Sequence, residues 1–444
     1  MPDSGVVAVS YERSISARPH ELAPESVWSI DIPPVRVGRG AIEELGHQLS
    51  RLGVDDGARG LLVTDGTLAS LGHARRVADH VENAGYDIDI YDGSEREPSI
   101  ASVEECVSFV REGTEGGYDF YVGLGGGSCM DTAKTTRAVL ANGGDVLDYV
   151  AEPTGGGEDL TERGPPLVLI PTTAGTGSEV SAVAVLSVEE KTIKEGISDS
   201  SVRADAAVLD PTLTTTLPPE MTATTAMDAL GHAIEGYTTQ AYDELLRPED
   251  PADRPVYAGR TDFTELFSER AIALLAGNVR AAVNNGEDLA AREGLLKGAL
   301  YGAIAGLTAG AHLCHAMAYP VGNRYHTHHG ETVAVLTPAS TLGYNVASDP
   351  PRFAEVAEML GADTGGTSVR EAADLAREEY VRLQRDLNVL PSGLNDLAGV
   401  TEEDVDWLAR RTVETQARLL RPNPRPVTET AVADVYRDAL YNWA

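Results

Sequence analysis

Short β-rich runs alternate with amphipathic helical stretches between Val27 and Pro211, and this alternation limits the possible folds more than any other feature of the chain. Strands that alternate with helices predict a mostly parallel sheet covered by crossover helices. The expected strands are GLLVT (60–64), YDIDI (86–90), FYVGL (120–124) and LVLIP (167–171), and helices are expected between them, for example over 74–84 and 100–113.

The pattern changes after Pro211, where long segments rich in Ala, Leu, Glu and Arg replace the β-branched runs. These segments predict helices over 219–240, 263–284, 289–313, 351–360 and 368–387, and the proline-rich stretch 247–255 predicts an exposed loop. We therefore expect three parts: a loose N-terminal arm (1–26), an α/β domain (27–211) and an all-helical domain (212–444).

Composition is consistent with two hydrophobic cores. The chain has 444 residues, of which 42% are hydrophobic, and a single core stops growing at about 250–300 residues. We find no run of the roughly 18 apolar residues that a membrane helix needs, and no apolar signal core behind a basic start. Three widely spaced cysteines do not form a disulfide framework. These features predict a soluble, cytoplasmic protein.

The charge balance is strongly acidic. Asp and Glu number 69 against 35 Lys and Arg, only four of which are Lys, and the formal net charge is -34. The acidic residues are interleaved with the apolar pattern, which indicates a solvated acidic surface of the kind suited to a halophilic, high-salt cytoplasm. Nucleic acids and anionic membranes are poor partners for such a surface.

A glycine-rich turn follows the expected strand FYVGL. Gly125, Gly126, Gly127 and Ser128 lead into a predicted helix, and a helix N-terminus approached through glycines is a favourable phosphate site. The spacing differs from the usual G-x-G-x-x-G of dinucleotide-binding proteins, so a purely structural turn is the alternative.

Two further segments support dinucleotide binding. The run PTTAGTGSE (171–179) places Thr172, Thr173 and Thr176 after a strand, where open α/β sheets bind ligands. Asp65 follows the strand GLLVT and is suited to accept hydrogen bonds from a ribose 2′-hydroxyl and to repel a 2′-phosphate, which favours NAD over NADP. An Asp before Gly66 is also an ordinary turn residue.

The helical half contains most of the histidines. Asp228 and His232 have i,i+4 spacing, which places a carboxylate and an imidazole on one helix face where they can share Fe²⁺ or Zn²⁺. Five more histidines follow: His312, His315, His326, His328 and His329. Ordinary surface or core positions are the alternative for any of them, and we assign His20, His47, His73 and His80 to such positions.

These two candidate sites together predict an oxidoreductase. A Lewis acid in the helical half would lower the pKa of an alcohol, and a nicotinamide held by the α/β half would accept its hydride. The substrate would be a small alcohol, aldehyde or hydroxy acid.

Five motifs together resemble the iron-containing (group III) alcohol dehydrogenase family, from about Pro34 to about Asn423. They are GGGSCMDTAK (125–134), PTTAGTGSE (171–179), LDPTLTTTLPP (209–219), MDALGHAIEGY (227–237) and HAMAYPVG (315–322). The resemblance implies metal ligation by Asp228, His232, His315 and His329, and a homodimer or larger homo-oligomer. It also implies cofactor contacts from Asp65, Gly126, Gly127, Ser128, Asp131, Thr172, Thr173, Thr176 and Lys194.

One position departs from the family pattern. Many members carry a further histidine four residues after the third ligand, where this chain has Tyr319. Because tyrosine does not titrate near neutrality unless its pKa is strongly lowered, the proton relay must differ. Besides Tyr319, the neighbouring His312 and His328 are candidates for that role.

Within the family, HLCHAMAYP (312–320), Arg254-Pro255-Val256-Tyr257 and AEMLGADT (357–364) resemble the hydroxyacid-oxoacid transhydrogenase branch. An NAD-dependent alcohol dehydrogenase shares the main motifs. A phosphate-sugar dehydrogenase or dehydroquinate-synthase-like lyase would need a basic cluster, but Lys297 is the only lysine of the helical half. A non-catalytic metal-binding protein would not need both sites. A substrate carboxylate would be received by Arg254, Arg260 or Arg324.

Overall fold

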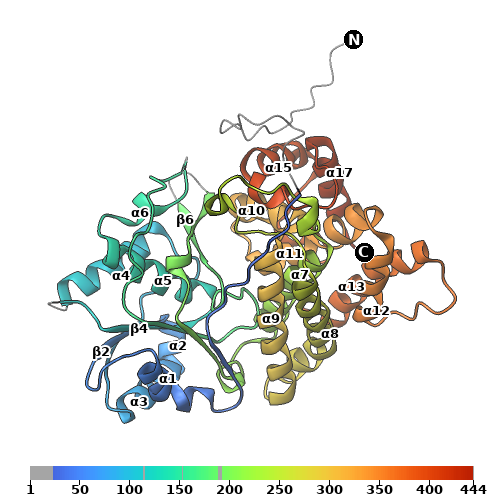
Figure 1. Cartoon of the computed structure of the whole chain (residues 1–444). Coiled ribbons are helices and arrows are strands. Elements are labelled where there is room, and N and C mark those ends of the chain that lie inside the picture. Colours follow the sequence, from blue (N-terminus) through green and yellow to red (C-terminus); the bar gives the residue numbers. More distant parts are fainter. Residues whose placement is uncertain (1–23, 114–115, 153, 189–192, 444) are drawn as a thin grey trace. The chain divides into compact units, whose positions relative to one another are not determined.

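The computed structural model describes residues 24–113, 116–152, 154–188 and 193–443, and its chain divides into two compact units (Figure 1). The α/β unit contains Asp31–Ala229 and Gly277–Ile304, and the helical unit contains the rest of the described residues. Of the predicted arm (1–26), all but Pro24 to Ser26 lies outside the described residues. The domain boundary near Pro211 stays a prediction; the last strand ends at Leu209.

The α/β unit is built on a six-stranded sheet in the order β1-β8-β5-β4-β2-β3, and every neighbouring pair is parallel. The strands are β1 (Val35–Val37), β2 (Arg59–Val63), β3 (Asp87–Tyr91), β4 (Phe120–Gly125), β5 (Leu167–Pro171) and β8 (Ala206–Leu209). The predicted fold class, a parallel α/β domain followed by an all-helical domain, is confirmed.

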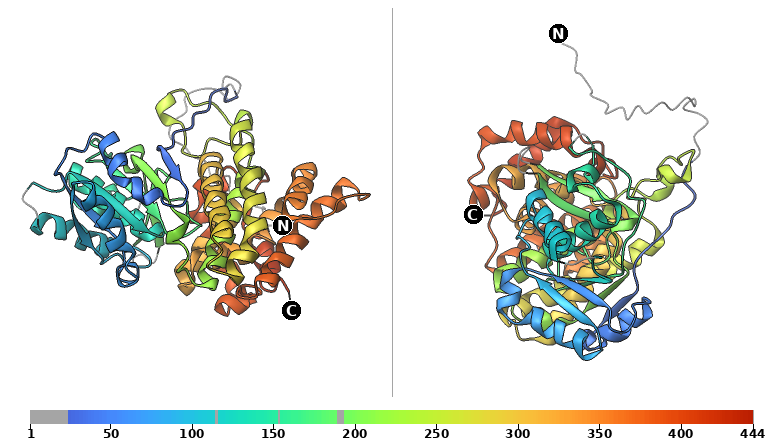
Figure 2. Two further views of the ribbon diagram at one scale, coloured as in Figure 1. Left: turned by 90° about the horizontal axis from the view of Figure 1, so that it is seen from below. Right: turned by 90° about the vertical axis from the view of Figure 1, so that its left-hand side faces the viewer.

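Helices cover both faces of this sheet (Figures 1 and 2). Leu62 of β2 packs with α1 (Leu45–Arg51) and α3 (His73–Asn83) on one face. Leu61 and Val63 pack with α4 (Ile100–Gly113) and α5 (Gly127–Asn142) on the other. Successive strand residues point to opposite faces, so a sheet covered on both sides needs the continuous apolar runs seen in the sequence.

A two-stranded antiparallel hairpin, which the sequence did not lead us to expect, accompanies the sheet. It consists of β6 (Val183–Val188) and β7 (Ile193–Ser198). The short helices of this unit are η1 (Ala41–Glu44), α2 (Gly66–Ser70), α6 (Val146–Tyr149), η3 (Ser200–Val202) and η4 (Pro211–Leu213). The hairpin was missed because β7 interrupts its apolar residues with Lys194 and Glu195.

The described chain after Leu209 contains helices and no strand, as predicted. The longer helices are α7 (Pro219–Thr238), α8 (Asp262–Asn284), α9 (Leu289–Ala309), α10 (Leu313–Tyr325), α11 (His329–Leu336), α12 (Pro350–Leu360), α13 (Val369–Leu387), α15 (Glu402–Thr415) and α17 (Glu429–Ala439). Shorter turns are η5 (Tyr242–Glu244), η6 (Pro251–Asp253), the π-helical η7 (Ser340–Tyr344), η8 (Asn345–Ala347), α14 (Leu394–Ala398) and α16 (Ala417–Leu420). None of the described helices is long and apolar enough to cross a membrane.

One predicted helix boundary was wrong. The segment 289–313 does not form one helix, because α9 ends at Ala309 and α10 begins at Leu313. Gly310 between them has φ +128°, a conformation that L side chains rarely adopt, and the His312 side chain accepts the N–H of Leu313 at the start of α10. This break places His315 in the first turn of a new helix.

Candidate functional site

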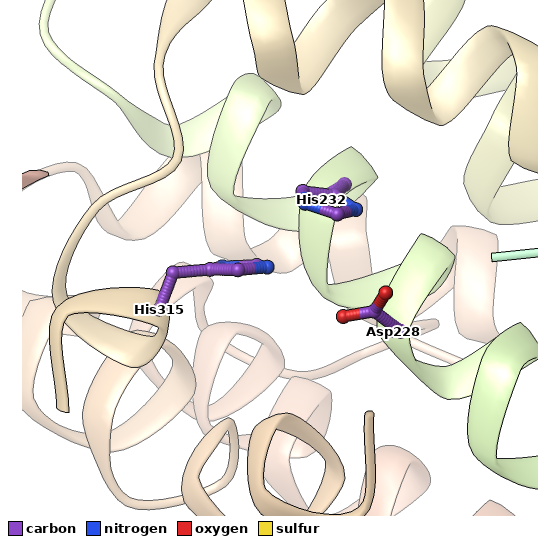
Figure 3. A group of neighbouring side chains, drawn as sticks. All are labelled: Asp228, His232 and His315. Carbon is purple, nitrogen blue, oxygen red and sulfur yellow. The ribbon is translucent and has the colours of Figure 1, made fainter. Parts of the chain in front are cut away.

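Three side chains that donate electron pairs meet on α7 and α10. Asp228 and His232 lie one turn apart on α7, and His315 lies in the first turn of α10. Their candidate ligand atoms all lie within 4.8 Å of one another, and all three residues are buried. Figure 3 shows the side chains pointing toward one another, and the two imidazole rings are stacked with centroids 4.3 Å apart. We call these three residues the metal cluster.

Small residues let the helix around His232 pack closely. A Cβ on Gly236 of α7 would lie 2.9 Å from the backbone nitrogen of Gly306 on α9. A Cβ on Gly306 would in turn lie 2.6 Å from the carbonyl oxygen of His232. Backbone-to-backbone packing of this kind requires glycine, and it fixes the turn of α7 that carries His232.

The donor set of the metal cluster fits a divalent transition metal. One carboxylate oxygen and two imidazole nitrogens are ligands that both Fe²⁺ and Zn²⁺ accept. The Nδ1 atom of His315 lies 2.6 Å from Oε2 of Glu235. Sequence reasoning missed Glu235, although its position seven residues after Asp228 on the same helix face was a usable signal.

His329, the fourth ligand expected from the family resemblance, lies nearby at the start of α11. Its ring centroid is 5.6 Å from that of His315 and 5.5 Å from that of Tyr319. Within the part of the chain that the structure describes, the group of converging donors does not include His329. Its role as a ligand stays a prediction.

The candidate proton-relay residues lie in different surroundings. Tyr319 is half-buried beside His329, whereas His312 is fully buried. The His312 ring contacts Thr238 Oγ1 through Nε2 (3.2 Å) and Glu235 Oε1 near Nδ1 (3.0 Å), which favours a structural role for it. His328 is half-buried and immediately precedes α11.

The glycine-rich turn joins β4 to α5 next to the segment that follows β5. Gly125 has φ +151°, and its carbonyl oxygen accepts the N–H of Thr172 at 2.9 Å. A Cβ on Gly127 would lie 2.9 Å from the side chain of Thr176. The structure therefore brings these predicted cofactor residues together at the carboxyl ends of two neighbouring strands. Gly126, Gly127, Ser128, Thr173 and Thr176 stay partly exposed there, while Thr172 is buried.

Beneath this turn lies a buried polar group that we call the loop cluster: Asp131 and Lys134 of α5 with Ser178 and Ser181. The Lys134 ammonium donates to Ser178 Oγ (2.8 Å), Ser181 Oγ (3.0 Å) and the Val183 carbonyl oxygen (3.0 Å). Asp131 accepts from Ser178 Oγ at 2.6 Å and from the Val185 N–H at 3.1 Å. The Asp131 carboxylate is thus engaged inside the protein, although the resemblance implied a cofactor contact.

Burial changes the pKa of each charged group here. It lowers the pKa of the Lys134 ammonium and raises that of the Asp131 carboxyl, while their mutual attraction opposes both shifts. Burial also raises the pKa of neighbouring Glu179 to about 7, against a weaker opposing effect of Lys134. Sequence reasoning assigned no role to Lys134 or Glu179, because nothing in their spacing predicts burial.

Of the two remaining cofactor candidates, Asp65 follows β2, the strand next to β4, and Lys194 lies on the hairpin strand β7. Asp65 caps α2, where one carboxylate oxygen accepts the N–H groups of Thr67 (2.8 Å) and Leu68 (2.9 Å). Its other oxygen is 3.4 Å from Sγ of Cys129, in the first turn of α5. Lys194 on β7 pairs with Glu97 at 2.7 Å.

The three arginines considered for a substrate carboxylate are ion-paired within the protein. Arg254 pairs with Glu25 at 3.0 Å. Arg260 pairs with Glu265 at 2.6 Å, and Arg324 with Asp404 at 2.8 Å.

Comparison with known proteins agrees with this site. Residues 33–211 match the family described as iron-containing alcohol dehydrogenase, and residues 256–440 match the C-terminal part of the Fe-containing alcohol dehydrogenase family. Long-chain-alcohol dehydrogenase 1 of Geobacillus thermodenitrificans is 34% identical, covering 93% of this chain and 97% of the relative. The mitochondrial hydroxyacid-oxoacid transhydrogenase of Xenopus tropicalis is 30% identical, covering 94% and 91%.

A solved structure gives the same result for the fold. The crystal structure of a 1,3-propanediol oxidoreductase superposes with a TM-score of 0.82 at 31% identity, covering 93% of this chain and all of that one. Sequence, fold and the converging donors of the metal cluster agree, and the chain belongs to the iron-containing alcohol dehydrogenase family of oxidoreductases.

Proposed function

We propose that this enzyme is an NAD-linked dehydrogenase of a small neutral alcohol, and that it works with Fe²⁺ held by Asp228, His232 and His315. The observation that carries the proposal is the convergence of these three buried donors within 4.8 Å. A metal bound there supplies Lewis acidity, which favours loss of the hydroxyl proton of an alcohol. Zn²⁺ accepts the same ligands and is the second candidate.

His329 is our candidate for the fourth ligand, supported by its position beside the His315 ring. Tyr319, next to His329, is our candidate for the residue that contacts the substrate hydroxyl. Its phenol acts there as a hydrogen-bond donor and acceptor, since tyrosine ordinarily titrates near pH 10. His312 would act indirectly, through its contacts with Thr238 and Glu235.

For the cofactor, we propose that the pyrophosphate of NAD lies at the N-terminus of α5, against Gly125 to Ser128 and the threonines 172, 173 and 176. Backbone N–H groups and the helix dipole favour an anion at such a position. The Asp65 carboxylate, close to the first turn of α5, would repel the 2′-phosphate of NADP. Lys194 would reach the cofactor only after leaving Glu97.

A neutral alcohol is favoured over a hydroxy acid by the state of the three candidate arginines. Each is ion-paired with a carboxylate of the protein, so receiving a substrate carboxylate would require breaking an ion pair. Because one relative is a hydroxyacid-oxoacid transhydrogenase, the experiment must also include a hydroxy acid with an oxo acid. We choose 4-hydroxybutyrate and 2-oxoglutarate as that pair.

The experiment measures product formation by the protein after it has been loaded anaerobically with Fe²⁺ in high salt. Primary alcohols with added NAD should give NADH and an aldehyde. Turnover of 4-hydroxybutyrate that needs 2-oxoglutarate and no added NAD would instead identify a transhydrogenase with a retained cofactor. No turnover in either assay would contradict the proposed substrate class.

We further propose a cytoplasmic homodimer adapted to high salt. The support is the net charge of -34, three buried thiols without a disulfide, and membership of the family. Since salt screens repulsion between exposed charges, the melting temperature should rise between dilute buffer and molar KCl. A melting temperature that falls as KCl is added would contradict the proposed adaptation to high salt. Light scattering measures the oligomeric state, and a monomeric mass would contradict the proposed homodimer.

A further inference from the structure

We propose that Glu235 is a positioning residue of the metal site. In this proposal Glu235 holds the start of α10 against α7 and orients the imidazole of His315 so that Nε2 is the nitrogen that would ligate a metal. The inference rests on the proposed metal-dependent function, and it assigns to Glu235 a task that neither the spacing of the ligands nor the family resemblance predicted.

The Glu235 carboxylate lies in a buried environment rich in hydrogen-bond donors. The side chain is completely buried, yet both of its oxygens are engaged. Oε2 accepts a hydrogen bond from the backbone N–H of His312 at 2.8 Å. Oε1 accepts one from the backbone N–H of Cys314 at 2.7 Å and another from the Thr341 hydroxyl at 2.9 Å. The first N–H groups of a helix have no acceptor within that helix, so a carboxylate from α7 satisfies them at the start of α10.

The contact with Glu235 also determines which nitrogen of His315 carries the proton. The Glu235 oxygens accept two backbone N–H groups and a hydroxyl, and this set of donors suits an ionised carboxylate. An ionised carboxylate only accepts hydrogen bonds, so in the 2.6 Å contact Nδ1 of His315 must be the donor. The lone pair of a neutral His315 is then on Nε2, the nitrogen suited to ligate a metal.

Helix α7 carries Glu235 on the same face as two of the candidate ligands. Asp228, His232 and Glu235 follow one another at i, i+4 and i+7 on one helix face. One rigid helix therefore carries two ligands and the group that orients the third. Hydrogen bonds of this kind, from a ligating histidine to a carboxylate, fix the ring and raise its basicity toward the metal.

A simpler alternative is that Glu235 only caps α10. Capping needs an acceptor oxygen, and the side-chain amide of glutamine still supplies one. Accepting hydrogen bonds from His315 Nδ1 and from both backbone N–H groups requires the two oxygens of the carboxylate. The two possibilities differ in what they predict for metal affinity when the fold is kept.

The experiment measures the affinity of purified protein for Zn²⁺ by competition with a chromogenic chelator. Glu235→Gln should weaken Zn²⁺ binding by about 10- to 100-fold, as loss of a histidine-orienting carboxylate does elsewhere, and leave NADH binding unchanged. The matched control is Thr341→Val, which removes one neutral hydrogen bond from the same carboxylate and should leave Zn²⁺ affinity close to wild type. A folded Glu235→Gln protein with wild-type Zn²⁺ affinity would overturn the proposal.

A second measurement does not depend on that variant folding. Nitrogen-15 histidine NMR of the Zn²⁺-loaded wild type should show His315 protonated on Nδ1, and protonation on Nε2 would overturn the proposal. If the wild type binds no Zn²⁺ or Fe²⁺ at all, the proposed metal-dependent function fails, and that result is distinct from a failure of the role of Glu235.

Discussion

The metal cluster and the loop cluster are both buried and polar, but they differ in their hydrogen-bonding groups. The loop cluster contains both donors and acceptors, whereas the metal cluster brings together groups that donate electron pairs to a metal. In the loop cluster, the cation of Lys134 lies among the carboxylate of Asp131, two hydroxyls and a carbonyl, so the protein supplies both donors and acceptors. In the metal cluster, a carboxylate and two imidazoles bring electron-pair donors together, and a cation completes the set. The first arrangement shapes a loop, and the second is suited to a ligand.

The largest effect should follow removal of a donor from the metal cluster. His315→Ala leaves two of the three donors, and turnover of alcohols should fall by about 10³-fold or more because a Lewis acid contributes several kcal/mol to the barrier. Metal content, measured by mass spectrometry of purified protein, should fall in parallel. His47→Ala is the control, since His47 is exposed on α1 and should change neither quantity.

The next largest effect should follow removal of the cation from the loop cluster. Lys134→Met leaves Asp131 buried without its charged partner, which should cost about 3–5 kcal/mol in the free energy of unfolding. The affinity for NADH should also fall, because the segment 178–183 loses three hydrogen bonds from Lys134. Urea unfolding and NADH fluorescence titration measure the two effects.

Arg75→Ala is a matched control for Lys134→Met, because it removes an exposed cation that pairs with Asp79 and Glu82. Its effect on stability should stay below about 1 kcal/mol. Equal unfolding free energies for Lys134→Met and the wild type would contradict the prediction, because the buried Lys134 would then stabilise the fold no more than a surface cation does.

A smaller, pH-dependent effect should come from Glu179. Its folded-state pKa of about 7 lies above the ordinary value of 4.5, so the folded protein holds this proton more tightly than the unfolded chain does. This contribution to stability is therefore fully present below about pH 4.5 and disappears as the pH rises through about 7, amounting to at most about 3 kcal/mol.

Glu179→Gln should remove that part of the pH dependence, so the variant should gain stability relative to the wild type between pH 5 and pH 8. Unfolding free energies of both proteins at the two pH values measure the gain. A stability difference that does not change with pH would show that Glu179 titrates normally and that burial does not control its charge.

Much of the fold could be predicted from periodicity. The runs GLLVT, YDIDI, FYVGL and LVLIP all became strands of the parallel sheet, and the helix expected over 100–113 is α4. The i,i+4 spacing of Asp228 and His232 also predicted their shared helix face. The failures occurred where local signals were weak: the hairpin β6–β7 mixes charged and apolar residues, and the break at Gly310 lies inside an otherwise helical composition.

Most strands and helices and the candidate donors could be predicted from the amino-acid sequence, because hydrophobic periodicity and residue chemistry are local properties. Which donors converge depends on tertiary packing, which brings His315 to His232 and Asp228, 83 and 87 residues earlier in the chain. The tertiary structure also showed that Asp131 is engaged with Ser178, and that Glu235 contacts His315. Such contacts depend on how helices pack and where buried carboxylates find hydrogen-bond partners, and no spacing along a single chain encodes that directly.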